Sequence, residues 1–187
     1  TQTAQPPFIA AMAEDGDFLL AKTPCAFAGL VVTKENDIPN GFAALVRELE
    51  RAKKFGFTAS EYARAKADYL RYLESAYNEK SKTRNSQYVN EYVRHFLDNE
   101  PIPGIETEYA LMNQIAPNIP LEAINTVFSQ IITDENIVIN VFGPDKEGVT
   151  YPTEEEILNV LKSVKAEELT AYVDKVSDEP LMKETPQ

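Results

Sequence analysis

The only histidine in the sequence, His95, lies among several carboxylates in the stretch EYVRHFLDNEPIPGIETEY, residues 91–109. These carboxylates are Asp98, Glu100, Glu106 and Glu108. Imidazole and carboxylate groups bind catalytic zinc and carry out acid–base chemistry. A zinc site, however, needs about three protein ligands, and the HExxH and HxxEH motifs each require two histidines. We therefore interpret His95 as a helix C-terminal residue that interacts with the helix dipole, with a weak metal site as the alternative.

The other groups that could carry chemistry are one cysteine and two clusters of acidic residues. Cys25 has no second cysteine with which to form a disulfide, and we expect it to be a small buried apolar residue. The acidic clusters are Glu154, Glu155 and Glu156, and Glu167 and Glu168. Paired carboxylates act as acid and base when their surroundings separate their pKa values. These clusters stand at predicted helix ends, so we assign them a capping role and name no catalytic, cofactor-binding or metal-binding residue.

The tyrosines are concentrated in the middle of the chain. The sequence has nine of them, and Tyr62, Tyr69, Tyr88 and Tyr92 follow helical spacing. Such a stripe is typical of packing in which the ring is buried and the hydroxyl group stays in water. An aromatic wall that faces a substrate is the alternative interpretation.

Composition narrows the class of partner. The chain has 187 residues, of which 43% are hydrophobic, and a formal charge of -12. This length suits one domain with a short appendage, and the acidity argues against nucleic acid or anionic lipid as a partner. No apolar run reaches the roughly 18–20 residues of a membrane span, so we predict no membrane insertion. The sequence begins TQTAQPPF without methionine, which we interpret as a segment of a longer protein.

The N-terminal part of the chain predicts two strands and a helix. Apolar runs at residues 8–13 and 26–35 are rich in Phe, Ile and Val, as strands are. The acidic segment between them, EDGD at residues 14–17, predicts a turn and an irregular stretch. After a breaker at DIPNG, residues 37–41, the apolar spacing of residues 42–56 predicts a helix.

The middle of the chain predicts successive helices. Thr58 and Glu61 form a capping box, which opens a helix that runs to about residue 80. A second apolar face within residues 88–97 predicts another helix that ends before Pro101. The polar sequence that joins these helices fits either a loop or an exposed turn of one long helix.

The last third of the chain predicts two more helices, a strand and a further helix. The helices occupy residues 105–116 and 121–132, and the β-branched run at residues 136–144 predicts a third strand. Thr153 and Glu156 then form a second capping box. This order predicts an α+β fold with a small, mainly antiparallel sheet of about three strands covered by several helices.

Several sequence pieces together resemble a known family. A helix ends in a Gly-Phe-Thr turn and a long helix follows, with the matching residues Gly56, Phe57, Thr58, Glu61, Ala65 and Lys66. Further on come an aromatic residue, a Pro-x-Pro-Gly turn and a glutamate, here Phe96, Pro101, Pro103, Gly104 and Glu106. A later strand-like run ends in Gly143 and Pro144. In order and spacing these pieces resemble the second, inactive-type domain of zinc metallopeptidases of the insulinase/pitrilysin family, peptidase family M16.

The resemblance implies a fold, a domain division and an indirect role. It covers roughly residues 8–165, and implies a partial M16-type half-domain at residues 8–168 whose N-terminal part is missing. Residues 1–7 would be a lead-in, and residues 169–187 a linker toward the next domain. In the family one domain carries HxxEH and binds zinc, and a partner domain of the same fold closes a chamber around the peptide. Because HxxEH is absent here, we expect no cofactor in this chain and zinc in the catalytic domain of the parent protein.

Three functions remain open on the sequence. The first is a noncatalytic domain of a zinc-dependent endopeptidase, with a catalytic M16 domain and a peptide substrate as partners. The second is a noncatalytic scaffold or core subunit of a multiprotein complex, and the third is a helical protein-interaction module. The resemblance is compatible with export to a bacterial periplasm, although the residues themselves do not fix the compartment.

Overall fold

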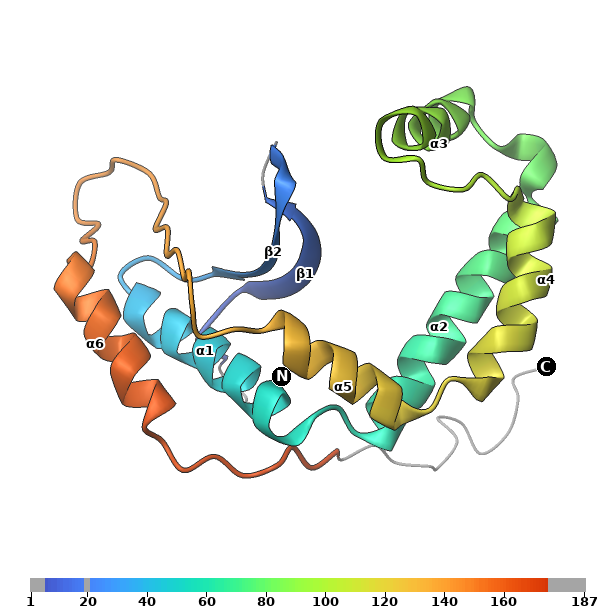
Figure 1. Ribbon diagram of the computed structural model, residues 1–187. Helices are drawn as coiled ribbons and strands as arrows, with labels where there is room; N and C mark the ends of the chain where they lie inside the picture. The colour runs from blue at the N-terminus through green and yellow to red at the C-terminus, as the bar shows by residue number, and fades with distance from the viewer. Residues whose placement is uncertain (1–5, 19–20, 175–187) are drawn as a thin grey trace, which may run out of the picture. The chain divides into compact units, whose positions relative to one another are not determined.

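The computed structural model describes residues 6–18 and 21–174, and for residues 17, 18 and 21–24 it describes the backbone alone. The strands are β1 (Ala10–Phe18) and β2 (Ala21–Val32). The α-helices are α1 (Ile38–Phe55), α2 (Ala59–Asn78), α3 (Asn85–Asp98), α4 (Ile105–Ile115), α5 (Leu121–Ile131) and α6 (Glu154–Lys165). Two short 3-10 helices, η1 (Lys80–Lys82) and η2 (Ala116–Asn118), stand after α2 and α4. Figure 1 shows these elements along the chain.

The chain divides into two compact units. One comprises Thr1–Gly56 and Asn125–Tyr172, and the other comprises Phe57–Ile124 and Val173–Gln187. We call them the sheet unit and the helical unit. The sheet unit holds β1, β2, α1, most of α5 and α6, and the helical unit holds α2, α3 and α4.

The two strands form an antiparallel hairpin. The register is regular from Ala10 with Val32 to Asp17 with Cys25, and after an irregularity Phe18 pairs with Ala21. The expected turn at residues 14–17 was therefore wrong, because these residues continue β1. Glu14 and Asp15 are exposed, so their carboxylates stay in water while the backbone pairs with the apolar β2 run.

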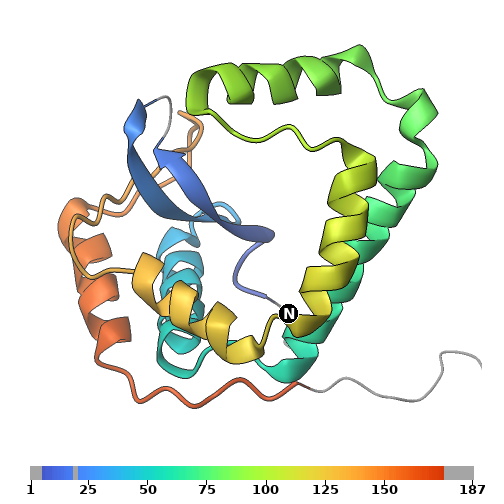
Figure 2. The ribbon, with the colours of Figure 1, turned by 45° about the vertical axis from the view of Figure 1, so that its right-hand side comes forward.

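One face of the hairpin packs on α1. A Cβ atom added to Gly29 of β2 would meet Leu49 at 3.2 Å and Leu45 at 3.4 Å, so the helix lies directly against the strand. In the same unit, Phe27 meets the edge of the Phe128 ring at a centroid distance of 5.8 Å. The α6 helix packs on α1 as well, as both views of the ribbon show (Figures 1 and 2).

Helix α1 begins four residues earlier than its apolar pattern predicts. The segment at residues 37–41 was expected to break the chain, but the helix starts at Ile38 with proline in its first turn. Proline is tolerated there because its missing N–H has no partner within the helix in any case. Gly41 is buried in this turn, where an added Cβ would collide with the Thr33 side chain.

The predicted capping box at the start of α2 is confirmed. The Thr58 hydroxyl accepts from the Glu61 N–H at 3.3 Å, and the Glu61 carboxylate accepts from the Thr58 N–H at 2.8 Å. The same arrangement opens α6, where Thr153 and Glu156 exchange contacts of 3.2 Å and 2.7 Å. These pairs satisfy backbone N–H groups that the helix leaves without a partner.

Helices α2 and α4 form the packed core of the helical unit and lie side by side (Figure 2). Leu73 of α2 is only 1% exposed. The rings of Tyr77 and Tyr109 stack with centroids 4.8 Å apart, and the Tyr62 hydroxyl donates to the Ile119 carbonyl at 2.8 Å. The polar sequence after α2 contains η1 and ends the helix, so the loop interpretation is the correct one.

The predicted third strand at residues 136–144 was wrong. This run forms no ladder with either described strand, although its composition is that of a strand. Ile137, Val138 and Phe142 are 47%, 66% and 87% exposed. A β-branched composition is therefore not sufficient for a segment to pair with a neighbouring strand. Among the described helices, none is long and apolar enough to cross a membrane.

Candidate functional site

The structure places His95 in the last turn of α3, as the helix-end interpretation expects. Its Nδ1 lies 2.7 Å from the Glu100 carbonyl oxygen, and because a carbonyl only accepts, Nδ1–H is the donor. The Glu100 carboxylate in turn accepts from Arg94 Nε at 2.8 Å. These contacts fold the chain back over the end of α3 and orient the imidazole toward the backbone.

The neighbouring carboxylates do not converge on His95. Glu106 pairs with Lys80 at 3.1 Å, and its own backbone N–H together with the Lys80 ammonium group lowers its carboxyl pKa. Glu108 lies 3.5 Å from the Tyr69 hydroxyl, whose pKa is raised by burial and by the Glu108 charge. Within the described ranges, no group of three or more His, Cys, Asp or Glu side chains is arranged to hold a metal ion.

Cys25 is exposed, which corrects the expectation that it is buried. It lies opposite Asp17 near the far end of the hairpin. The residues of β2 that meet α1 are nearer its C-terminal end, around Gly29. Which residues of β2 are buried therefore depends on where α1 packs along the strand. The sequence around Cys25 does not indicate that position.

The nine tyrosines divide into packed and exposed groups. Tyr62 and Tyr77 make the packing contacts of the helical unit, as the packing interpretation predicts. The exposed group consists of Tyr69, Tyr72, Tyr88, Tyr92 and Tyr151, at 42%, 66%, 39%, 57% and 41%. Packing therefore explains only some of the tyrosines, and the others present aromatic surface to solvent.

The strongest candidate surface is the face of the hairpin opposite α1. Side chains alternate across a strand, so Met12 and its cross-strand partner Leu30 share one face with Val32. They are 59%, 50% and 44% exposed. We call these three residues the open sheet face. An apolar surface of this kind is suited to receive aliphatic or aromatic side chains.

The backbone of the hairpin adds directional binding groups. Each strand is paired only with the other among the residues the structure describes, so each also has an outer edge of unpaired N–H and C=O groups. An extended peptide that adds to such an edge gains main-chain hydrogen bonds, and alternate side chains meet the faces of the sheet. The open sheet face with its edges can therefore bind an extended peptide.

A polar contact fixes the turn that leads from β2 into α1. The Asn36 side chain accepts from the Thr150 N–H at 2.8 Å and donates to the Gly148 carbonyl at 3.0 Å. Glu35 and Lys146 pair beside it at 2.7 Å. These contacts link the loop before α6 to the strand that carries the open sheet face.

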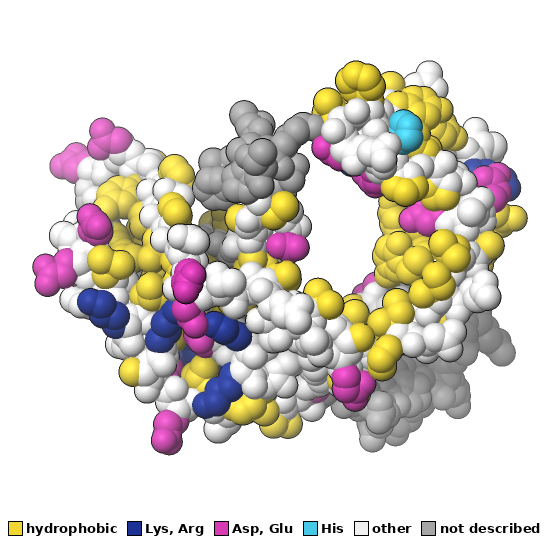
Figure 3. All heavy atoms as spheres, viewed as in Figure 1, with side chains coloured by type: hydrophobic (Ala, Val, Ile, Leu, Met, Phe, Trp, Pro, Cys, Tyr) yellow, Lys and Arg dark blue, Asp and Glu magenta, His cyan; other side chains and the backbone are white. Residues whose placement is uncertain are grey.

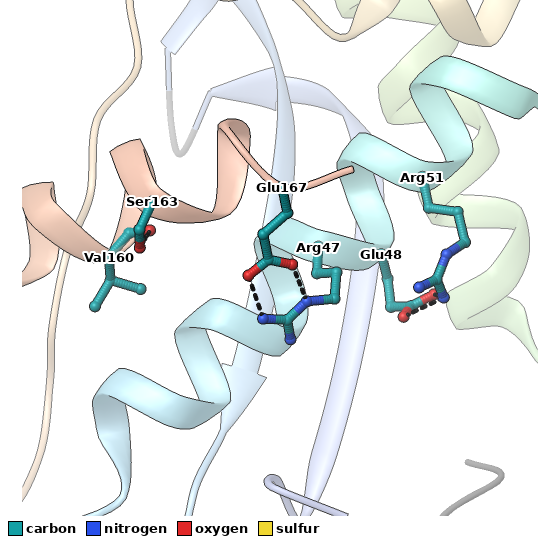
Figure 4. Close-up of polar contacts among 6 residues, drawn as sticks. All are labelled: Arg47, Glu48, Arg51, Val160, Ser163 and Glu167. Atoms are coloured by element: carbon teal, nitrogen blue, oxygen red, sulfur yellow. Dashed lines mark hydrogen bonds and ion pairs between the residues drawn. The ribbon is translucent and has the colours of Figure 1, made fainter. Parts of the chain in front are cut away.

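Ion pairs hold α6 and the segments around it on α1. The Arg47 guanidinium donates to both oxygens of Glu167 at 2.6 and 2.7 Å (Figure 4). Asp134 accepts from Lys53 at 2.8 Å and from Lys165 at 2.6 Å. We call these five residues the ion-pair clamp. Fork-shaped Arg–carboxylate pairs have defined geometry, so the clamp fixes α6 and the segments around it against α1.

Sequence reasoning missed the clamp and assigned Glu167 only a capping role. Arg47 and Glu167 are 120 positions apart, and Lys53 and Asp134 are 81 positions apart. Nothing local distinguishes these residues from other surface charges. The acidic cluster at Glu154, Glu155 and Glu156 does lie in the first turn of α6, where carboxylates interact favourably with the helix dipole.

The clamp predicts an acid-sensitive contribution to stability. Hydrogen bonds from Lys165 and Lys53 lower the pKa of Asp134 from 3.8 to about 2. A depressed folded-state pKa stabilises the fold above the unfolded pKa, and this contribution is lost as the pH falls from 3.8 toward 2. The carboxylate is 62% exposed, so solvent screening reduces the effect on unfolding to about 0.5–1 kcal/mol. We expect Asp134→Asn to lower the free energy of urea unfolding by that amount at pH 7.

The control for this prediction is Asp145→Asn. Asp145 is an exposed carboxylate of the same unit, and no described cation forms an ion pair with it. We expect it to change the unfolding free energy by less than about 0.5 kcal/mol. The Asp134→Asn effect should shrink at pH 2 and in high salt, and an effect that persists under both conditions would contradict an electrostatic origin.

The chain is similar in sequence to one kind of protease. It is 27% identical over 124 residues to a protein from Arabidopsis thaliana named zinc protease PQQL-like. That region covers 66% of this chain but only 13% of the relative. No protein-family model matches the chain.

Two solved structures share the fold. One is the first half of the periplasmic protease PqqL from Escherichia coli, with a TM-score of 0.65 and 18% identity over 90% of this chain and 36% of that chain. The other is PqqL itself, with a TM-score of 0.67 and 19% identity over 94% of this chain and 19% of that chain. The α+β fold with an antiparallel sheet and several helices is thus confirmed. The chain spans only a small part of each of these proteins.

Proposed function

We propose that this chain is a noncatalytic domain of a zinc-dependent endopeptidase. Its resemblance to the insulinase/pitrilysin peptidases (M16) is confirmed by sequence and fold. The similarity to a protein named as a zinc protease is the observation that carries the proposal. The sequence contains a single histidine, so HxxEH cannot be formed within these 187 residues. Hydrolysis therefore depends on another domain of the parent protein, where zinc would supply an activated water.

The contribution of this chain is to bind and orient the peptide. The open sheet face offers Met12, Leu30 and Val32 to side chains of an extended peptide, and the strand edges offer main-chain hydrogen bonds. The packing of α1 on β2 supports this surface from behind, and the ion-pair clamp joins α1 to α6. Holding a substrate in one orientation lowers the entropic part of the barrier for a reaction that occurs on a neighbouring domain.

A charge placed on the open sheet face tests this role in the parent protein. We expect Leu30→Lys to lower kcat/KM for an internally quenched peptide by about tenfold, which corresponds to about 1.4 kcal/mol of lost binding. Leu30 is already 50% exposed, so we expect the thermal unfolding midpoint to change little.

The matched control is Leu158→Lys on α6, a helix that packs on α1 and carries no part of the open sheet face. Leu158 is 39% exposed, so the same chemical change is made at a comparable apolar position. We expect it to leave kcat/KM within about twofold of the parent protein. Equal kcat/KM values for the parent protein and the Leu30→Lys variant would show that the open sheet face does not bind the substrate peptide.

The coding sequence of the parent protein distinguishes a peptidase domain from the alternative, a noncatalytic scaffold subunit. An HxxEH motif in the same polypeptide, with a glutamate further downstream, supports the closing domain of a zinc peptidase. If such a motif occurs only in a separate subunit, or nowhere in the complex, the function shifts toward a noncatalytic scaffold subunit. Inhibition of peptide cleavage by a chelator, reversed by zinc, then checks the chemistry of the complete protein.

A further inference from the structure

Helix α3 carries the most exposed apolar surface of the helical unit. Six large residues form two rows at a spacing of four, and their exposed fractions lie between 39% and 86%. The rows are Tyr88, Tyr92 and Phe96, and Val89, Val93 and Leu97. We call these six residues the α3 stripe. Figure 3 shows hydrophobic side chains gathered over this helix.

The two rows follow one side of the helix. Residues four positions apart lie above one another on an α-helix, so the rows form one continuous apolar ridge. The opposite side carries polar groups, among them Arg94, which is paired with Glu100. The helix is thus amphipathic. Every α3 residue except Glu91 is exposed among the described residues, so the apolar side has no cover from them.

Helix α3 needs a cover for its own stability. It has 14 residues, and isolated helices of about 12–15 residues are only marginally stable in water. Most helical stability in proteins comes from packing of the amphipathic face. A protein segment that packs permanently on the apolar side of α3 would stabilise the helix. A peptide that is bound and released in every catalytic cycle would not.

We propose that the α3 stripe is the docking surface for another part of the same parent polypeptide, beyond these 187 residues. The lengths of the relatives support this occupant, because the chain covers 13% of the Arabidopsis protein and 19% of PqqL. A second copy is disfavoured because each chain carries a formal charge of -12. The inference rests on the proposed function, in which this chain is one domain of a longer protein. It adds the surface through which that domain is joined to the rest.

Site-specific photo-cross-linking in the intact parent protein tests this inference. The photoreactive residue p-benzoylphenylalanine replaces Phe96, which is 86% exposed within this chain. After irradiation, mass spectrometry of the digested protein identifies the linked segment. We expect intramolecular links to residues outside the 187-residue segment. The control places the same group at Arg94, on the polar side of the helix, and we expect at least fivefold less of these links.

Every other outcome overturns the inference. Links from position 96 to a second copy, to a labelled substrate peptide or only to residues 1–187 would assign the stripe to a different occupant. Equal yields at positions 96 and 94 would show that the apolar side is not specifically covered.

Hydrogen–deuterium exchange in the unmodified parent protein provides a second test. We expect the amides of α3 to exchange at least tenfold more slowly than those of an unprotected helix, and unprotected exchange would contradict a permanent cover. Neither test uses peptide cleavage as its readout. A negative result in these two tests would therefore contradict the docking inference alone, and an unchanged kcat/KM for Leu30→Lys would contradict only the proposed peptide-binding role.

Discussion

Replacing Leu73 by alanine should lower the free energy of unfolding of the helical unit by about 2–4 kcal/mol. Leu73 is 1% exposed and is the only large side chain below 2% exposure among the described residues. Truncation to alanine removes buried methyl groups and leaves a cavity between helices that relax only in part. The expected loss is a large fraction of the roughly 5–15 kcal/mol that stabilises a typical domain.

The neighbouring residue provides the control for the core prediction. Tyr72 is 66% exposed on the same helix, so Tyr72→Ala should change the free energy of unfolding by less than about 0.5 kcal/mol. Urea unfolding followed by circular dichroism measures both variants, and hydrogen exchange of α2 and α4 shows whether the loss is local. Similar losses for both variants would mean that Leu73 is not the centre of this core.

Gly56→Ala should lower the free energy of unfolding by about 3–4 kcal/mol for two separate reasons. Gly56 has φ 72° and ψ -174° at the end of α1, a conformation that is essentially confined to glycine. A Cβ atom at this position would also lie 2.5–2.9 Å from the Asn125 amide group. The backbone strain contributes about 1–3 kcal/mol and the steric conflict adds to it.

Gly148→Ala separates the two contributions. Gly148 also has a positive φ of 82°, but an added Cβ would meet nothing within 4 Å. This variant should lose only the contribution of backbone strain, about 1–3 kcal/mol. Denaturant unfolding of both variants gives the difference directly, and equal losses would show that contact with Asn125 contributes nothing at Gly56.

Local sequence signals predicted the helical parts of the fold well. The capping boxes at Thr58 and Thr153 involve residues three positions apart, so the sequence contains the whole interaction. The apolar pattern predicts too late a start for α1, because the proline that suggests a breaker is in fact favourable in a first helical turn. The lesson is that the position of a proline relative to a helix matters more than its presence.

Features that depend on distant partners were not predictable in this way. The run at residues 136–144 has the composition of a strand, but a ladder requires a neighbouring strand that composition does not specify. The exposure of Cys25 depends on where α1 ends its contact with β2. The role of Asp134 depends on lysines 81 and 31 positions away. Long-range contacts of this kind determine the open sheet face and the ion-pair clamp.

The uncovered run at residues 136–144 has a consequence for the solubility of the isolated chain. NIVINVFGP contains no charged residue, and its first seven residues combine β-branched and aromatic side chains. Short segments of this composition form cross-β aggregates when they are exposed at high concentration. Asp134 and Glu135 precede the run and Asp145, Lys146 and Glu147 follow it, so charged gatekeepers flank both ends. Neutralising these flanking charges would favour fibrous self-association of the chain over the dispersed state.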